Sequence, residues 1–334
     1  DGAALQVQDD NEQFTTLTVS SQKHIGINFT TAELTMQLDD FAERVLKPRI
    51  SQLASSIDAD VDNVGSLLRL SSLLPATLDI APLLSEAKRQ LHEEADYLRE
   101  ADQMRRYQAL LAENPAFILP APVDELSGKN VLAMDFIKGQ PIETLASAPQ
   151  ETRDAVMSAL ITLTLRELFE FGYMQTDPNF ANFRWQAESQ RIVLLDFGAA
   201  RAVPPHIVAA YRELMVAGLT EDRAALRAAL LSIGFVAPAT LDRHGPAIDA
   251  MIDILIEHLG KPGLFDFADR SFVDRVRHHA ETIVADRAAW HIPPADTLFV
   301  QRKVSGTALL AVRMQARMPL RDEVARFFPD IPRL

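Results

Sequence analysis

The spacing of apolar residues predicts a chain made mostly of helices. Near the start, two strand-like runs at 3–8 and 12–20 flank a polar turn and indicate a hairpin. The sequence Thr30-Thr31-Ala32-Glu33 is a capping box, and apolar residues at helical spacing continue from it through Val45. Pro48 interrupts this pattern, so we expect a kink or a stop there.

Strands are expected again only in the middle of the chain. Helical patterns fill the chain after residue 204, with breaks near 220, 234–238, 260–263 and 292–294. The mixture predicts an α+β fold whose second half is largely helical. The segments between 64 and 195 are a helix at 64–74, a long helix at 83–111, a strand at 131–137, a helix at 153–171 and a buried strand at 192–195.

Three polar residues between 172 and 201 have protein-kinase spacing. Asp177 and Asn182 stand five apart, and Asp196 opens a D-F-G fourteen residues later. In kinase-type phosphoryl transfer the first Asp orients the nucleophile, while the Asn and the second Asp bind Mg²⁺ on the ATP phosphates. Pro178 keeps Asp177 out of the helical region, as a catalytic loop requires. We therefore predict Asp177 as catalytic, Asn182 and Asp196 as metal ligands, and ATP with Mg²⁺ as cofactors. The alternative is a solvated Asp/Asn turn before a core strand.

An acidic cluster lies on the predicted helix 83–111. Asp96 and Glu100 are like charges four residues apart, a spacing that destabilises a helix. The cluster, which includes Glu94, indicates cationic partners such as Mg²⁺ or a lysine, and we expect these three side chains to face the cleft. The alternative is an acidic surface helix held by Arg99 and Arg105.

Three stretches together resemble the UbiB/ADCK family of atypical kinases, which is linked to ubiquinone biosynthesis. They are Q-T-D-P-N-F-A-N around Asp177, H-E-E-A-D-Y-L-R-E-A at 92–101, and V-L-A-M-D-F-I-K-G-Q-P-I at 131–142. The resemblance covers about 58–334. It implies a protein-kinase-like fold, an ATP/Mg²⁺-dependent kinase or ATPase activity, and ubiquinone-pathway proteins or lipid-like precursors as partners.

The same resemblance assigns further cofactor-binding residues. Glu94 and Asp96 correspond to the family's E-x-D motif, and Glu100 would pair with a strand lysine. The hinge, whose backbone contacts adenine in kinases, corresponds to four consecutive residues: Met134, Asp135, Phe136 and Ile137.

The first 57 residues lack the expected kinase motifs. No K-x-G-Q helix, phosphate-covering loop or strand lysine is found there. Lys47 stands at about the position expected for the strand lysine, but it precedes a proline. Gln6 lies in a strand-like run but is not a lysine. We therefore predict weak nucleotide binding and very low turnover. Residues 7–61, through H-I-G-I-N-F-T-T-A-E-L-T-M-Q-L-D-D-F-A-E-R-V-L-K, instead resemble the major coat protein of P22-like tailed phages.

These resemblances predict a chimeric chain joined near 56–61. Residues 1–57 would form an atypical hairpin and helix, 58–137 a partial kinase N-lobe with the E-x-D helix and hinge strand, and 138–334 a helical C-lobe. Because the chain opens on Asp1 rather than Met, we expect a fragment or a processed form.

The amino-acid composition limits the classes of molecule that the protein can bind. A net charge of −13 argues against non-specific nucleic-acid binding. The absence of cysteine excludes disulfides and thiolate metal sites. No signal peptide and no apolar run of membrane-spanning length is found in the sequence. We expect the protein in the cytoplasm or peripherally at the inner membrane. Two other functions stay open, a small-molecule phosphotransferase of the aminoglycoside-kinase type and a non-catalytic nucleotide-binding scaffold.

Overall fold

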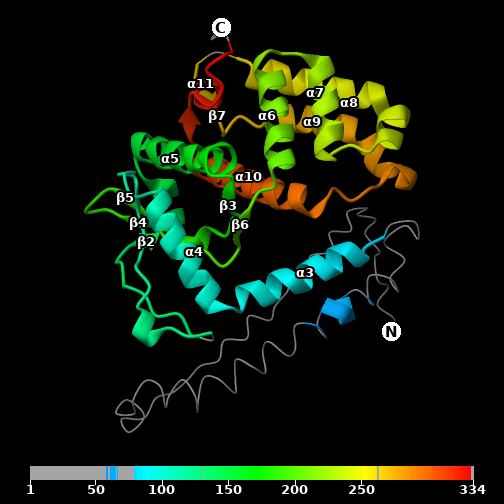
Figure 1. Cartoon of the computed structure of the whole chain (residues 1–334). Coiled ribbons are helices and arrows are strands. Elements are labelled where there is room, and N and C mark those ends of the chain that lie inside the picture. Colours follow the sequence, from blue (N-terminus) through cyan, green and yellow to red (C-terminus); the bar gives the residue numbers. More distant parts are fainter. Residues whose placement is uncertain are drawn as a thin grey trace, which may run out of the picture.

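The computed structural model describes most of the chain after residue 78. The described residues are 58, 61–64, 66, 79–129, 131–261 and 263–331. The predicted hairpin, the capping-box helix, Gln6 and Lys47 lie outside them. Figure 1 shows a sheet-containing part beside the helix α4 (Tyr97–Leu110), and a helical part that holds the helices after residue 204.

The expected long helix 83–111 is two helices instead of one. α3 (Ala81–Glu94) ends before Asp96, and α4 (Tyr97–Leu110) begins after it at a clear angle (Figure 1). Asp96 has an extended backbone, and its side chain accepts a hydrogen bond from the Arg99 N–H at 3.3 Å. Asp is a preferred N-cap, and a carboxylate is stabilising at a helix N-terminus. The like charges of Asp96 and Glu100 therefore sit at a helix start, where they are favourable, and not in mid-helix.

The predicted kinase-like motif around Asp177 and Asp196 lies next to a four-stranded sheet. Its order is β1-β5-β4-β2, with β1 parallel to β5 and the other pairs antiparallel. The buried run predicted at 192–195 forms β5, whose last three residues are buried. The strands are β1 (Phe117–Ile118), β2 (Gln140–Pro141), β4 (Phe183–Gln186) and β5 (Arg191–Leu194).

The strand expected at 131–137 forms only isolated bridges. Val131 pairs with Gly128, and Met134 pairs with Pro122. The Ala133 N–H donates to the Ser127 Oγ at 3.0 Å, and the Ala121 N–H donates to the Asp135 Oδ2 at 3.3 Å. Side chains thus bond two backbone donors that a regular antiparallel ladder would use, which explains why the apolar run does not become a regular strand.

α5 (Gln150–Phe169) is the central helix, close to the predicted 153–171. Gly172 follows it with a φ of +55°, a conformation that glycine adopts without strain, and the chain then enters β3 (Tyr173–Gln175). β3 pairs with β6 (Ala200–Ala202), so the chain segments before and after the catalytic motif lie side by side. Short 3₁₀ turns complete this region: η3 (Asp124–Leu126), η4 (Ile142–Ser147) and η5 (Phe180–Asn182).

The helices after residue 204 break at the four predicted places, and a further break at 315–319 was not predicted. α10 (Ala295–Met314) returns from the far side of the helical part to lie beside α5 (Figure 1), and its Leu310 and Met314 belong to the main core. None of the helices in the described ranges is long and apolar enough to span a bilayer. The remaining elements are α6 (Pro205–Leu219), α7 (Arg223–Ile233), α8 (Pro238–Leu259), β7 (Phe265–Asp266), α9 (Ser271–Ala285), η6 (Arg287–Ala289), β8 (Arg317–Met318) and α11 (Leu320–Ala325).

Candidate active site

The loop between β3 and β4 holds the first two predicted residues. η5 places Asn182 next to Asp177, and the Asn182 Nδ2 donates to Asp177 Oδ2 at 2.9 Å. Because the amide nitrogen faces a carboxylate, the Asn182 Oδ1 is turned away from Asp177. The Asn182 carbonyl also accepts from the Leu195 N–H at 3.0 Å, which ties this loop to the residue before Asp196.

Asp196 follows β5 and shares a small pocket with Asn182. Burial raises the pKa of Asp196, the hydrogen bond from the Gly198 N–H opposes this, and the charge of Asp177 raises the pKa further. Asn182 bonds the Asp177 carboxylate and lines this pocket together with Asp196. The structure therefore brings Asp177, Asn182 and Asp196 to one place.

Gln175 connects the two acidic segments, which the sequence did not indicate. Its Oε1 accepts from the Asp177 N–H at 2.6 Å, and its Nε2 donates to the Asp196 carbonyl at 3.2 Å. The Gln175 N–H donates in turn to the buried Glu167 at 3.2 Å. A side-chain amide can make both bonds at once because it carries a donor and an acceptor. Gln175 thus sets the spacing between Asp177 and Asp196.

Replacing Gln175 by Ala should loosen the Asp177 backbone. Loss of one hydrogen bond of about 1 kcal/mol should lower the protection of the Asp177 amide about fivefold in hydrogen exchange followed by NMR. The Asn182 amide, which donates to the Asn179 carbonyl, is the internal control and should keep its protection. Equal protection of Asp177 in both proteins would contradict the bridging role.

Glu100 lies beside the D-F-G segment. Its side chain is buried and accepts from the Phe197 N–H at 3.4 Å. A Cβ placed on Gly198 would lie 3.5 Å from Asp196 Oδ1 and 3.7 Å from Glu100 Oε2, so both carboxylates border this glycine. Of the three acidic residues predicted to face the cleft, Glu100 lies beside the D-F-G segment, Asp96 caps α4, and the side chain of Glu94 lies outside what the structure describes. Their orientation toward a nucleotide stays a prediction.

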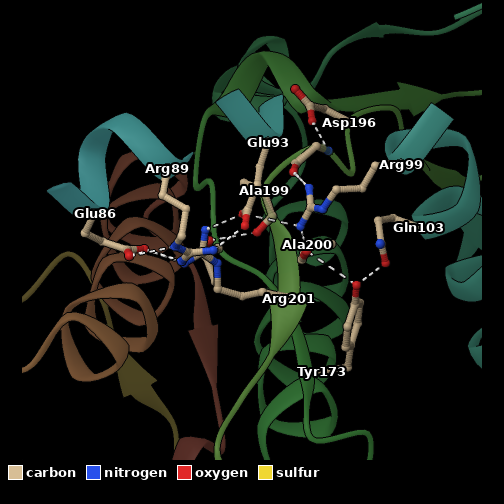
Figure 2. A network of polar contacts seen from close by, with 12 residues as sticks. Glu86, Arg89, Glu93, Arg99, Gln103, Tyr173, Asp196, Ala199, Ala200 and Arg201 are labelled. Atoms are coloured by element: carbon tan, nitrogen blue, oxygen red, sulfur yellow. Dashed lines mark hydrogen bonds and ion pairs between the residues drawn. The ribbon is translucent and has the colours of Figure 1, made fainter. Parts of the chain in front are cut away.

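A network of ion pairs holds α3 and α4 against the residues after D-F-G. Figure 2 shows Arg99, which donates to the carbonyls of Gly198 at 2.6 Å and Ala200 at 2.8 Å. Arg201 forms ion pairs with Glu86 at 3.0 Å and Glu93 at 3.5 Å. Arg89 bonds the same two carboxylates. Burial works to raise the pKa of Glu86, but the bonds from Arg89 and Arg201 outweigh it and lower the pKa. These contacts join the residues 198–201, which follow Asp196, to α3 and α4.

The predicted hinge runs along the edge of the sheet. It leads into β2, which pairs with β4, the strand that begins directly after Asn182. Phe136 is 92% exposed and Met134 is 37% exposed. The pocket shared by Asn182 and Asp196 is lined by side chains from other segments of the described chain. The structure thus places the hinge segment at the sheet edge beside β4, while its four side chains line no part of that pocket.

α10 reaches the catalytic loop with residues that sequence reasoning missed. Arg302 Nη2 lies 2.8 Å from Asp177 Oδ1, and the buried Lys303 Nζ lies 3.3 Å from Glu167 Oε2. One turn on, a Cβ on Gly306 would lie 2.0 Å from the Pro178 Cβ. A lysine within the apolar face of a helix and a glycine inside the same helix are signals of close packing that the sequence does contain.

The residues present fit a magnesium ion bound with a nucleotide. The described part of the chain contains no group of three or more His, Cys, Asp or Glu arranged as a closed metal site. Mg²⁺ typically takes one or two oxygen ligands from the protein and completes its shell with phosphates and waters. The Asn182 Oδ1 and the Asp196 carboxylate are oxygen donors of this kind.

Comparison with known proteins extends these observations. Residues 35–230 match the family described as ABC1 atypical kinase-like domain. This range begins inside the first 57 residues, and the predicted boundary near residue 57 stays a prediction.

Two curated relatives are named as mitochondrial atypical kinases. The chain is 34% identical to atypical kinase COQ8B of Danio rerio over 84% of this chain and 45% of that protein. It is 33% identical to atypical kinase COQ8 of Saccharomyces cerevisiae over 86% of this chain and 56% of that protein. The chain thus spans about half the length of these relatives.

A solved structure shares the fold. It is Rv3197 of Mycobacterium tuberculosis, described in complex with erythromycin, and it matches 82% of this chain and 68% of its own with a TM-score of 0.62 and 20% identity.

Proposed function

The chain belongs to the ABC1 atypical kinase-like family, and on this premise we propose that it binds ATP with Mg²⁺ and transfers or hydrolyses the terminal phosphoryl group. The observation that supports the proposal most is the Asp177–Asn182 bond at 2.9 Å in a loop that Gln175 ties to Asp196. Phosphoryl transfer needs positioning and charge neutralisation more than covalent chemistry. This arrangement supplies the positioning and the oxygen ligands for Mg²⁺, and the ion when bound would supply the charge neutralisation.

Each residue has a proposed role. Asp177 orients the attacking oxygen and accepts its proton. Asn182 and Asp196 hold Mg²⁺, which when bound neutralises charge on the phosphates. Glu100 contacts the cofactor site from α4, with Asp96 fixing the start of that helix. Glu94 and the hinge backbone of Met134, Asp135, Phe136 and Ile137 complete the proposed nucleotide site.

We further propose that the activity belongs to ubiquinone biosynthesis, with a lipid-like precursor or a pathway protein as substrate. The names of the curated relatives as COQ8-type mitochondrial kinases support this assignment. A peripheral position at an inner membrane agrees with it. Incubation of the protein with candidate prenylated precursors and radiolabelled ATP tests it, and label that stays in ATP and phosphate alone would contradict it.

Nucleotide binding should depend on Mg²⁺. ATP with Mg²⁺ at about ten times its Kd should stabilise the protein by about 1.4 kcal/mol in thermal unfolding, while ATP or Mg²⁺ alone should do much less. AMP is the control, because it lacks the β- and γ-phosphates that would bind Mg²⁺ together with Asn182 and Asp196. An ATP effect that is unchanged by chelating Mg²⁺ would contradict the assignment of these two residues.

A further inference from the structure

Both carboxylate oxygens of Asp177 have a partner. Oδ2 accepts from Asn182 at 2.9 Å, and Oδ1 pairs with Arg302 at 2.8 Å. A residue that orients an incoming hydroxyl or water needs an oxygen free to accept its proton. Arg302 therefore has to give up Oδ1 when the acceptor binds, or share it.

The backbone of α10 is fixed independently of this ion pair. Gly306 packs against Pro178 so closely that a Cβ at residue 306 would overlap the proline ring. Lys303, next to Arg302, is anchored on the buried Glu167. The Arg302 Cα is thus held beside the catalytic loop whether or not its guanidinium pairs with Asp177.

Other cations around the site are already engaged. Lys303 is 3% exposed and pairs with Glu167, while the Nη atoms of Arg99 are bonded to two carbonyls. Arg201 pairs with two glutamates of α3. Arg302 is 44% exposed, and within the described part of the chain its guanidinium makes the single polar contact with Asp177. Most of its five N–H donors remain available.

We propose that Arg302 binds the terminal phosphoryl group of the nucleoside triphosphate. On binding, the guanidinium exchanges Asp177 Oδ1 for phosphate oxygens. The freed carboxylate oxygen then accepts the proton of the acceptor hydroxyl or water while the acceptor oxygen bonds the terminal phosphorus, the bond from that phosphorus to the bridging oxygen breaks, and the nucleoside diphosphate leaves. The planar guanidinium suits phosphate, and it supplies positive charge from the side of the acceptor. This inference rests on the proposed function and names a specificity residue within it.

The test compares ATP with ADP, both with Mg²⁺, by calorimetry on the full chain. Arg302→Gln should weaken ATP binding about ten- to a hundredfold, the loss of a charge-assisted hydrogen bond, and should leave ADP within about twofold. Arg302→Lys keeps the charge and should recover part of the ATP affinity. Arg313→Gln is the matched control, because Arg313 lies on the same helix in an exposed pair with Glu143. It should change neither affinity.

The outcomes separate the inference from the proposed function. Parallel losses for ATP and ADP would show that Arg302 only supports the loop, and unchanged ATP affinity would show that it does not reach the phosphate. Either result overturns the inference and leaves the proposed function standing. An unaltered protein that binds neither nucleotide would overturn both. Thermal unfolding of each variant verifies that it is folded.

Discussion

Asp196→Asn should abolish Mg²⁺-dependent ATP turnover, with a loss of at least about a hundredfold. Asn keeps the shape of Asp and can still accept from the Gly198 N–H, but it removes the charge that would hold the ion. Asp222→Asn is the matched control. Asp222 caps α7 by accepting from the Ala225 N–H at 3.0 Å, and Asn is an equally good cap. The control should retain turnover, which phosphate release measures.

The same substitution should stabilise the nucleotide-free protein. Burial raises the pKa of Asp196 above its ordinary value of 3.8. An acid whose pKa is raised on folding contributes stability below the unfolded pKa, and this contribution is lost as the pH rises through the folded pKa. At neutral pH the ionised Asp196 thus lowers stability, and Asn relieves that effect. A higher melting temperature at pH 7 with no Mg²⁺ response is the expected pair of results. A lower melting temperature would contradict this account.

The pH dependence of Mg²⁺ binding follows from the same carboxyl. Mg²⁺ requires the ionised form, so its affinity should decline as the pH falls through the raised pKa, in a window that opens above 3.8. The decline should begin at a higher pH than an exposed Asp would give.

Lys303→Met should destabilise the fold by about 3–5 kcal/mol, because it leaves a buried charge without its partner. Glu167 is fully buried, and its Oε1 accepts from the Tyr107 hydroxyl at 2.7 Å. Burial and the charge of Glu167 raise the pKa of Tyr107 well above its ordinary value, so Tyr107 stays a donor. Lys303 is the cation on the other oxygen. Urea unfolding followed by circular dichroism measures the loss.

Two further variants isolate the charge effect. The double variant Lys303→Met with Glu167→Gln contains no unpaired charge and should recover much of the stability lost in the single variant. Lys138→Met is the control, because Lys138 is 84% exposed and should change stability by no more than about 0.5 kcal/mol. A single variant as stable as this control would show that the pair does not matter for folding.

The loop that holds Asp177 and Asn182 and the strand before Asp196 were predictable because the information for them is local. Asp177, Pro178, Asn182 and Asp196 lie within twenty residues of sequence, and the strand before Asp196 is a short run of apolar residues. Three of the predicted helix breaks, at 234–238, 260–263 and 292–294, were predictable for the same reason, since glycine and proline determine the backbone where they stand.

Two predictions made from the spacing of apolar residues were wrong because side-chain hydrogen bonds to the backbone changed the local structure. The helix 83–111 has continuous helical spacing, yet the Asp96 side chain bonds the Arg99 N–H and starts a second helix. The apolar run 131–137 has strand character, yet the side chains of Ser127 and Asp135 bond two backbone N–H groups that a regular ladder would use.

The contacts of α10 could not be predicted from spacing. Arg302 and Asp177 are far apart in sequence, and only the return of α10 beside α5 brings them together. The bridging role of Gln175 was hidden for a similar reason, since it depends on β3 and β6 lying side by side.

Because Gly306 packs directly against Pro178, the register of α10 relative to the loop that holds Asp177 cannot shift without loss of this contact. An insertion of one residue between Phe299 and Arg302 would rotate the following side chains by about 100°, turning Lys303 and Gly306 away from Glu167 and Pro178. The family match stops at residue 230, whereas α10 begins at Ala295. A shortened chain that ends where the match ends would therefore lack one wall of its own catalytic loop.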